Sequence, residues 1–265
     1  MTIDALMHAS DLPRLEAEVL MSRALNRDRT WLLAHGDEEV RGHDREVIED
    51  WCTRRLKGEP VAYITGEREF FGRTFRVTPA VMIPRPSTEE LVRSAREFLD
   101  HPQPFIREAD AGIVIVSRVL RPSFLPQRIV DVGTGSGCIA VTLALECPEL
   151  KVIATDVSAE ALNIARENAT LHHVDDRVRF FQGTDLEPVR DLQEPFLLVA
   201  NPPYIPDGTV LEHQVADYEP HAALFAGSDG GDVLRILLRQ AREHPFCAGI
   251  VCECQTNQSI WFNQA

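Results

Sequence analysis

A glycine-rich segment and an acidic residue downstream of it have the spacing of a ligand-binding turn. Residues 131–137 read DVGTGSG, directly after a predicted strand and before a predicted helix. Glycines let the backbone turn tightly and approach a ligand closely, because they have no Cβ atom. Asp156 lies 19 residues after Gly137, at the end of the next predicted strand. A carboxylate in that place can accept hydrogen bonds from both hydroxyls of a ribose, so a nucleoside-containing ligand is expected.

A second segment with chemical potential is NPPY, residues 201–204, which follows another predicted strand. The two prolines fix φ and have no N–H group. The segment therefore offers acceptors: the side-chain carbonyl of Asn201 and the main-chain carbonyls of Pro202 or Pro203. Such an array suits an –NH2 group, which has two N–H donors to satisfy. Tyr204 adds a flat surface on which a planar amide or a base can stack.

The elements that must position these groups alternate between strand and helix from residue 128 onward. Apolar segments such as RIVDV, KVIATD, VRFFQ, PFLLVA and AGIVCEC predict five strands. Helical patterns lie between them, one of them capped by Ser158. This alternation predicts an α/β fold with a parallel, doubly wound sheet, whose ligands lie at the carboxyl ends of the strands.

The chain divides into three predicted segments. Residues 1–67 read as short helices that bury one face and form a small helical domain. Residues 68–127 predict a hairpin within 69–86, then a helix, and then a proline-containing linker or insertion at 101–127. Residues 128–265 carry the alternating strands and helices together with both chemical segments.

Charge and composition exclude several classes of protein. The chain has 27 Lys and Arg residues against 41 Asp and Glu residues, a net charge of −14, which argues against coating nucleic acid by charge alone. We find no apolar run long enough to span a membrane and no secretory signal at the start, so no membrane association is expected. The six cysteines show no metal-ligand spacing, so no metal site is predicted. Reduced thiols and a cytoplasmic location are expected.

The glycine segment, the downstream acid and the NPPY segment together resemble class I S-adenosylmethionine-dependent methyltransferases that methylate an amino group. Further segments resemble the HemK/PrmC family, whose members methylate the side-chain amide nitrogen of the glutamine in the Gly-Gly-Gln motif of peptide-chain release factors. The resemblance implies S-adenosylmethionine as cofactor, release factors as protein substrates, and residues 1–67 as a substrate-binding domain. The segments that carry it are PVAYITG at 60–66, EFFG at 69–72, IPRPSTEELV at 83–92, EPHAALFAG at 219–227, Asp229 with Gly230, and Glu253 with Gln258.

The resemblance also implies roles for residues at the cofactor site. Asp156 would hold the ribose, and Asp185 with Leu186 would lie beside the adenine. Many relatives have an aromatic residue where Leu186 stands. The residues that would wrap the methionine part of the cofactor are Gly133, Thr134, Gly135, Ser136 and Gly137.

At the acceptor side, the resemblance implies that Asn201 and Pro202 carry the catalytic role by binding the two N–H groups of the glutamine amide. Asn201 would also lie near the methyl group to be transferred. Pro203 and Tyr204 would complete the substrate site. No general base is evident, because proton loss can follow the transfer.

Three features depart from the family pattern. Ser87 stands where relatives have Glu, and the segment 101–127 is longer than the usual linker. Class I methyltransferases add two more strands after the fifth, one of them antiparallel, whereas this chain continues only to Ala265. The expectation therefore leaves open a sheet that lacks its last two strands and exposes an edge.

Three other functions stay open at this point. A glutamine methyltransferase of a ribosomal protein is the nearest, and IPRP before the Thr88–Glu90 run favours the release-factor group. A DNA or RNA amino methyltransferase would use the same acceptor segment on a flipped base. An inactive module that binds the cofactor without methyl transfer belongs to a different class.

Overall fold

The computed structural model describes residues 1–262. Contacts between residues divide the chain into two compact units: Met1–Glu67 together with Leu211–Tyr218, and Arg68–Val210 together with Glu219–Ala265. The smaller unit has a hydrophobic core of its own, to which Ile3, Leu20 and Ile48 belong. None of the helices within residues 1–262 combines the length and the apolar composition that a membrane span requires.

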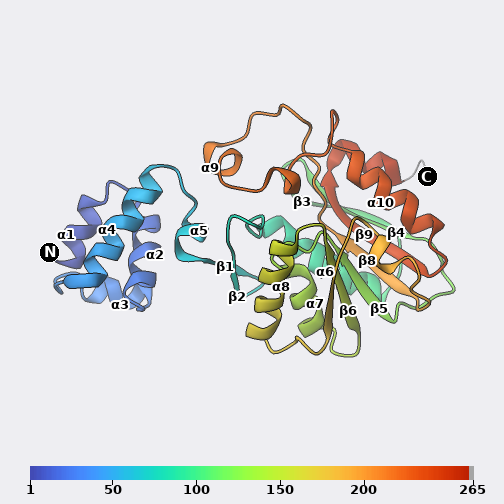
Figure 1. The fold of residues 1–265 in the computed structure, drawn as a ribbon, viewed down its shortest axis with the longest axis horizontal. Helices are drawn as coiled ribbons and strands as arrows, with labels where there is room; N and C mark the ends of the chain where they lie inside the picture. The colour runs from blue at the N-terminus through green and yellow to red at the C-terminus, as the bar shows by residue number, and fades with distance from the viewer. Residues whose placement is uncertain (263–265) are drawn as a thin grey trace. The chain divides into compact units, whose positions relative to one another are not determined.

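The smaller unit consists of short helices (Figure 1). The helical pattern predicted for the first 60 residues is therefore confirmed, with one more short helix at the start of the chain. Thr2 and Asp28 cap two of the helices, since their side chains accept hydrogen bonds from backbone N–H groups of the first turn. The helices are α1 Ile3–Ala9, α2 Arg14–Ala24, α3 Arg29–Ala34, α4 Gly42–Leu56, α5 Val61–Thr65 and α9 His213–Ala216.

The larger unit is built on a seven-stranded sheet in the order β3-β4-β9-β8-β5-β6-β7. The strands β5 to β9 run parallel to one another, and β4 is antiparallel to both of its neighbours. This confirms the predicted doubly wound α/β fold. The strands are β3 Phe105–Asp110, β4 Ile113–Val119, β5 Arg128–Val132, β6 Lys151–Asp156, β7 Val178–Gln182, β8 Phe196–Ala200 and β9 Cys247–Gln255.

Helices cover both faces of this sheet. Successive residues of a strand point to opposite faces, so Ile129 belongs to one hydrophobic cluster and Val130 to the other. The first cluster contains residues of α6 Pro86–Asp100, α7 Cys138–Glu146 and the end of α8 Ala159–Leu171. The second contains residues of α10 Asp232–Glu243 and of the 3₁₀ segment η3 Thr256–Phe262.

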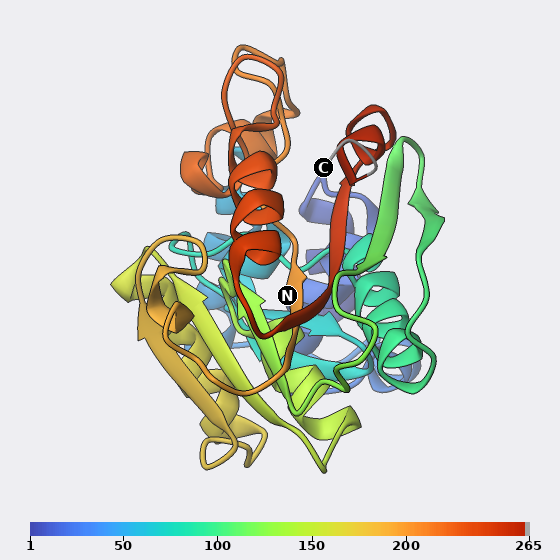
Figure 2. The ribbon, with the colours of Figure 1, turned by 90° about the vertical axis from the view of Figure 1, so that its right-hand side faces the viewer.

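The edge of the sheet beside β9 differs from the sequence expectation. Residues 105–119 belong to the segment 101–127, for which the sequence predicts a linker or insertion. They form the antiparallel strands β3 and β4, and β4 pairs with β9 (Figure 2). Val114 lies opposite Cys254, and Val116 lies opposite Cys252. The expectation of a sheet without its last two strands is therefore wrong, because an earlier hairpin supplies one antiparallel strand and one outer strand at that edge.

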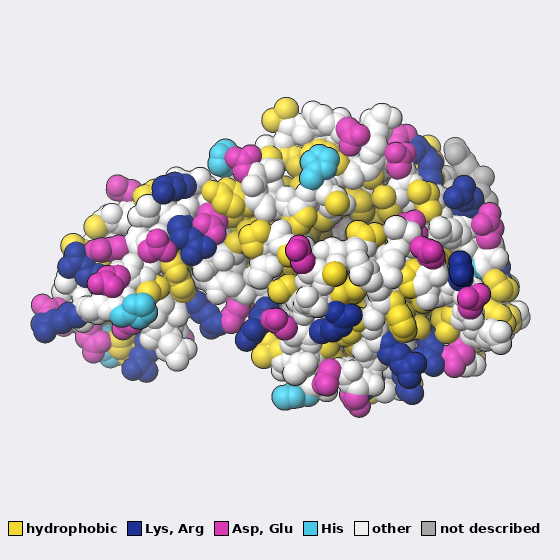
Figure 3. Space-filling view, viewed as in Figure 1, with side chains coloured by type: hydrophobic (Ala, Val, Ile, Leu, Met, Phe, Trp, Pro, Cys, Tyr) yellow, Lys and Arg dark blue, Asp and Glu magenta, His cyan; other side chains and the backbone are white. Residues whose placement is uncertain are grey.

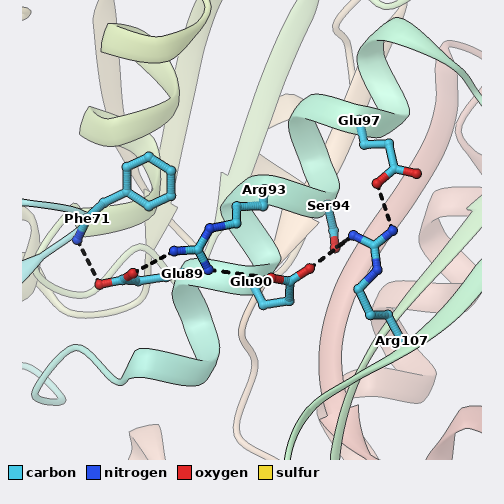
Figure 4. Close-up of polar contacts among 7 residues, drawn as sticks. All are labelled: Phe71, Glu89, Glu90, Arg93, Ser94, Glu97 and Arg107. Carbon is cyan, nitrogen blue, oxygen red and sulfur yellow. Dashed lines mark hydrogen bonds and ion pairs between the residues drawn. The ribbon is translucent and has the colours of Figure 1, made fainter.

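An arginine attaches this hairpin to α6 (Figure 4). The guanidinium of Arg107 on β3 donates to Glu90 at 2.9 Å, to Ser94 at 3.2 Å and to Glu97 at 2.7 Å. The hydrogen bonds to Glu97 and Glu90, the one to Glu97 first, raise the pKa of Arg107. Because α6 begins beside the NPPY segment, the hairpin and the site share one supporting helix.

The small hairpin that precedes α6 is attached to the same helix. It pairs β1 Glu67–Phe70 with β2 Arg73–Arg76, a shorter hairpin than the one predicted within 69–86. At its turn, Phe71 has a φ of +53° and its N–H donates to Glu89 of α6 at 2.9 Å (Figure 4). This contact holds the turn between β1 and β2 against α6.

A conservative substitution tests whether β4 belongs to the folded sheet. Ile115 on β4 is fully buried in the first hydrophobic cluster, whereas Ile106 on β3 is 56% exposed. Ile115→Val should lower the free energy of unfolding by about 1 kcal/mol, because a buried methylene is lost. Ile106→Val removes the same group from an exposed position and should change little. Equal denaturant midpoints for the two variants would contradict the burial of β4.

Candidate functional site

Three predicted site segments leave neighbouring strands at one level of the sheet. Val132 on β5 is in register with Thr155 on β6 and with Ala200 on β8. The residues that follow these three are the first glycine of the DVGTGSG segment, Asp156 and Asn201. The sheet thus brings all three segments together at the carboxyl ends of its central strands, as the sequence predicts.

The glycine turn has a shape that other residues would not adopt freely. Gly133, Gly135 and Gly137 have φ values of +72°, +53° and +80°. A Cβ at Gly137 would come within 3.0 Å of the Cβ of Ala165 on α8, so this glycine allows α7 and α8 to pack closely. A Cβ at Gly133 or Gly135 would meet no atom within 4 Å. The backbone at these two positions therefore borders open space that a ligand can approach.

Asp156 is connected directly to the glycine turn. Its Oδ2 accepts a hydrogen bond from the Gly135 N–H at 2.9 Å, and its Oδ1 accepts one from the Ser158 N–H at 2.9 Å. Each carboxylate oxygen can accept a further bond. The carboxylate is thus held in place with acceptor capacity left for a pair of hydroxyls.

Asp131, at the start of the DVGTGSG segment, is a buried carboxyl group to which the sequence analysis assigned no role. It is fully buried, and its Oδ2 accepts from the Thr134 hydroxyl at 2.6 Å and from the Ala140 N–H at 3.1 Å. Its Oδ1 has no hydrogen-bond partner within the described residues. Burial raises the pKa of Asp131 to about 7, and the nearby charge of Asp156 adds to this. An unpaired buried carboxylate oxygen is a place for a cationic group.

A second residue that the sequence analysis missed supports the turn from behind. Asn168 on α8 is fully buried, and its Nδ2 donates to the carbonyls of Ser136 at 2.8 Å and Arg76 at 2.9 Å. Its Oδ1 accepts from the Arg76 N–H at 2.7 Å. The available signal was a polar residue within the apolar stripe of this helix, next to Ala169.

Asp185 and Leu186, in the segment after β7, differ in burial. Asp185 is half-buried with a φ of +50°, and burial raises its pKa while Arg239 opposes the shift. Leu186 is 3% exposed and belongs to the cluster that contains Val132. Its N–H donates to the side chain of Gln240 at 2.9 Å. Leu186 can therefore offer an apolar contact beside the β5 end, but its N–H is already occupied.

The NPPY segment begins directly after β8. The Nδ2 of Asn201 donates to the Thr88 hydroxyl at 2.9 Å, so its Oδ1 is directed away from Thr88 as an acceptor. No described residue donates a hydrogen bond to the carbonyls of Pro202 or Pro203. These are the acceptors that the sequence predicts for an –NH2 group. The hydroxyl of Tyr204 donates to Glu253 at 3.1 Å, which fixes the position of the ring.

Glu253 and Gln258, near the end of the chain, form hydrogen bonds that support the NPPY segment. Glu253 on β9 is fully buried and accepts from the hydroxyls of Tyr204 and Ser87, the latter at 3.3 Å. Burial raises the pKa of Glu253, and the hydroxyls of Thr88, Tyr204 and Ser87 counteract this. Gln258 is also fully buried, and its Nε2 donates to the Tyr204 carbonyl at 3.0 Å. Both residues therefore hold the NPPY segment, and the Oε2 of Glu253 has no hydrogen-bond partner within the described residues.

The IPRP and EPH segments contact each other. The Arg85 guanidinium donates to Glu219, whose side chain is 1% exposed, and the Ile83 N–H donates to the same carboxylate at 3.3 Å. The ion pair closes the segment before α6 onto the one that follows NPPY. In this way most of the sequence blocks quoted for the family resemblance in the larger unit meet around the carboxyl ends of β8 and β9.

Comparison with protein families agrees with this geometry. The model of the PrmC N-terminal domain matches residues 2–66, and the model of the methyltransferase small domain matches residues 95–246. The chain is 38% identical to the release factor glutamine methyltransferase of Koribacter versatilis, over 88% of this chain and 75% of that one. It is 42% identical to the protein of the same name from Chlorobaculum tepidum, over 82% and 69%.

Solved structures share less with the chain. The hMettl16 catalytic domain has a TM-score of 0.47 at 14% identity, covering 75% of this chain and 63% of that one. The human methyltransferase 10 domain containing protein has a TM-score of 0.38 at 18% identity, covering 59% and 63%.

Proposed function

Because this chain belongs to the release factor glutamine methyltransferase family, we propose that it transfers a methyl group from S-adenosylmethionine to the side-chain amide nitrogen of the glutamine in the Gly-Gly-Gln motif of peptide-chain release factors. The observation that carries the proposal is the set of acceptors at Asn201 and Pro202, one strand away from the glycine turn. An amide –NH2 supplies the two donors that these acceptors need.

The residues present fit S-adenosylmethionine. The open backbone at Gly133 and Gly135 and the neighbouring Thr134 and Ser136 would hold its methionine part, with Gly137 shaping the turn. The unpaired Oδ1 of Asp131 matches a ligand that carries an ammonium and a sulfonium group. Asp156 would accept the ribose hydroxyls, and Asp185 with Leu186 would border the adenine. When bound, the cofactor supplies an electrophilic methyl group.

The protein's own contribution is alignment. An amide nitrogen is a poor nucleophile because its lone pair is delocalised into the carbonyl. The Asn201 and Pro202 carbonyls would bind its two N–H groups and direct the nitrogen toward the methyl group, while Pro203 and Tyr204 confine the amide plane. Orientation can lower a barrier by about 7–11 kcal/mol in the most favourable cases. The same fixed carbonyls favour positive charge that develops on the nitrogen.

The smaller unit is proposed to recognise the protein substrate. The PrmC N-terminal domain model covers residues 2–66, close to the 1–67 range expected for a helical substrate-binding domain.

On the face of the larger unit seen in Figure 3, basic and acidic side chains are interspersed and surround a band of hydrophobic side chains. Such a face suits a protein better than a nucleic acid backbone. All six cysteines are buried and free, in keeping with a cytoplasmic location.

Labelled methyl transfer is the direct test. The purified chain is incubated with S-adenosylmethionine labelled in the methyl group and a release factor. Label is expected in the parent release factor and not in the variant with Ala in place of the glutamine of Gly-Gly-Gln. Label in a ribosomal protein or a nucleic acid instead would refute the proposed substrate. Cofactor binding without any transfer would indicate a binding module.

Asp156→Ala tests the ribose contact. Because a hydrogen bond to a charged group contributes about 1.5–3 kcal/mol, the variant should bind S-adenosylmethionine about tenfold to a hundredfold more weakly. Isothermal calorimetry measures the change, with Asp175→Ala, an exposed aspartate between α8 and β7, as the control. Unchanged affinity in Asp156→Ala would remove this carboxylate from the site.

A further inference from the structure

A pocket lies within the smaller unit, between the end of α4 and the short helix α9. Its cavity volume is about 460 Å³. One side is lined by residues 55–58, where α4 ends, and the other by residues 212–214, where α9 begins. Both sides belong to the same compact unit. The methyl transfer proposed for the larger unit makes no use of this pocket.

Two contacts hold the walls of the pocket together. Gly58 has a φ of +96°, and a Cβ at this position would lie 2.7 Å from the Nδ1 of His213. Because glycine has no Cβ, α9 can approach the end of α4 this closely. The hydroxyl of Tyr218 donates to the carbonyl of Lys57 at 3.3 Å, across 161 residues of sequence. The pocket therefore depends on tertiary contacts that fix α9 against α4.

The side chains at the pocket leave one cation without a partner. Lys57 is exposed, and its ammonium forms no hydrogen bond or ion pair within residues 1–262. Beside it, the apolar side chain of Leu56 is 57% exposed. This pair suits a peptide segment that carries an acidic and an apolar side chain. The other charged side chains at the pocket each have a polar partner: Arg55 with Glu16, Glu212 with Gln214, and His213 with Asp217.

The course of the chain connects the pocket with the acceptor segment. Residues 211–218 carry α9 and belong to the smaller unit, but in the sequence they lie between NPPY and Glu219, which binds Arg85. A protein bound at α9 is thus held on the stretch of chain that follows the substrate acceptors. Two linked contacts strengthen the binding of one partner, because the second binding event becomes intramolecular. The partner that would use both contacts is the methylated protein itself.

We propose that this pocket is a docking site for the release factor and takes a segment of it that carries an acidic and an apolar side chain. The inference rests on the proposed function, because it concerns the same substrate. Gly-Gly-Gln contains neither kind of side chain, so the docking segment lies outside that motif. Lys57 pairs with the acidic side chain, and Leu56 contacts the apolar one. Docking contributes to binding and not to the chemical step, so its loss raises KM and leaves kcat unchanged.

Charge reversal at Lys57 tests the acidic contact. Lys57→Glu should raise KM for the release factor about tenfold at low salt, because attraction to a carboxylate becomes repulsion. The increase should shrink at high salt, since exposed charges are screened. The control is Lys151→Glu, which changes the only other lysine of the chain, exposed at the start of β6. A parental KM in Lys57→Glu, or an equal increase in Lys151→Glu, would overturn the docking site.

Leu56→Ala tests the apolar contact. The variant should raise KM about threefold to tenfold, because less apolar surface is buried on docking. Leu33→Ala is the matched control, since Leu33 on α3 is also 57% exposed but does not line the pocket. It should keep the parental KM. Equal KM values for the two variants would contradict an apolar contact in the pocket.

Crosslinking locates the partner and needs no turnover. A carbodiimide joins a carboxyl group and a lysine amine in contact into an amide, and itself takes up the water that is lost. With the Gln→Ala variant of the release factor, Lys57 should become joined to an Asp or Glu outside the motif, identified by mass spectrometry. Lys57→Arg keeps the charge, so it should keep the parental KM without this crosslink.

The crosslink also separates the docking site from the proposed function. A parent protein that crosslinks through Lys57 but transfers no methyl group would refute the proposed function alone. Methyl transfer to the release factor without a crosslink at Lys57 would refute the docking site alone.

Discussion

Asn201→Ala should reduce the rate of methyl transfer about a hundredfold to a thousandfold while the protein still folds and binds S-adenosylmethionine. The variant loses the side-chain carbonyl that is directed away from Thr88. Removal of one fixed polar contact that acts in the transition state has an effect of this size in other enzymes. Single-turnover kinetics with a release factor measures the rate, and calorimetry measures cofactor affinity.

Two further variants make the result specific to the acceptor role. Asn163→Ala removes an exposed asparagine from α8 and should retain the parental rate. Asn201→Asp still accepts hydrogen bonds but adds a negative charge near a sulfonium, which can strengthen cofactor binding without helping transfer. It should bind the cofactor and react more slowly than the parent. A parental rate in Asn201→Ala would show that another group receives the substrate amide.

Asp131→Asn should remove a strong pH dependence from the stability of the cofactor-free protein. Burial raises the pKa of Asp131 from 3.8 to about 7 in the folded state. The folded protein therefore binds more protons than the unfolded chain between these two pH values, and the free energy of unfolding falls as pH rises through that window. The difference corresponds to roughly 4 kcal/mol, which is present below pH 4 and lost above pH 7.

Denaturant unfolding of parent and variant between pH 4 and pH 8 measures this effect. The stability difference between them should change by up to about 4 kcal/mol across the range in favour of Asp131→Asn at high pH. Asp176→Asn, at an exposed position, is the control and should follow the parent. Saturating S-adenosylmethionine should flatten the parental curve, because a cationic ligand lowers the pKa of a nearby carboxyl. Parallel curves for the parent and Asp131→Asn would contradict the assignment.

The amino-acid sequence by itself determined the individual strands, the glycine turn and the proline-fixed segment of this protein. The segments RIVDV, KVIATD and VRFFQ coincide with β5, β6 and β7 from end to end. Strand pattern, a glycine turn and a proline-fixed segment depend on backbone preferences of neighbouring residues, so a sequence can specify them without its tertiary context. The glycine turn, Asp156 and the NPPY segment lie at one edge of the sheet because parallel strands all end on the same side.

Only the tertiary structure decided the strand pairings and hydrogen bonds between residues that are far apart in the chain. The pairing of β4 with β9 places Val114 opposite Cys254, and no local period could predict that 105–119 would complete the sheet. Likewise, Ser87, Tyr204 and Glu253 meet from three separate elements, because the hydroxyls of the first two donate to one buried carboxyl group. Sequence spacing predicts which groups can do chemistry. Their hydrogen-bond directions and pKa values depend on burial and on partners that only folding brings together.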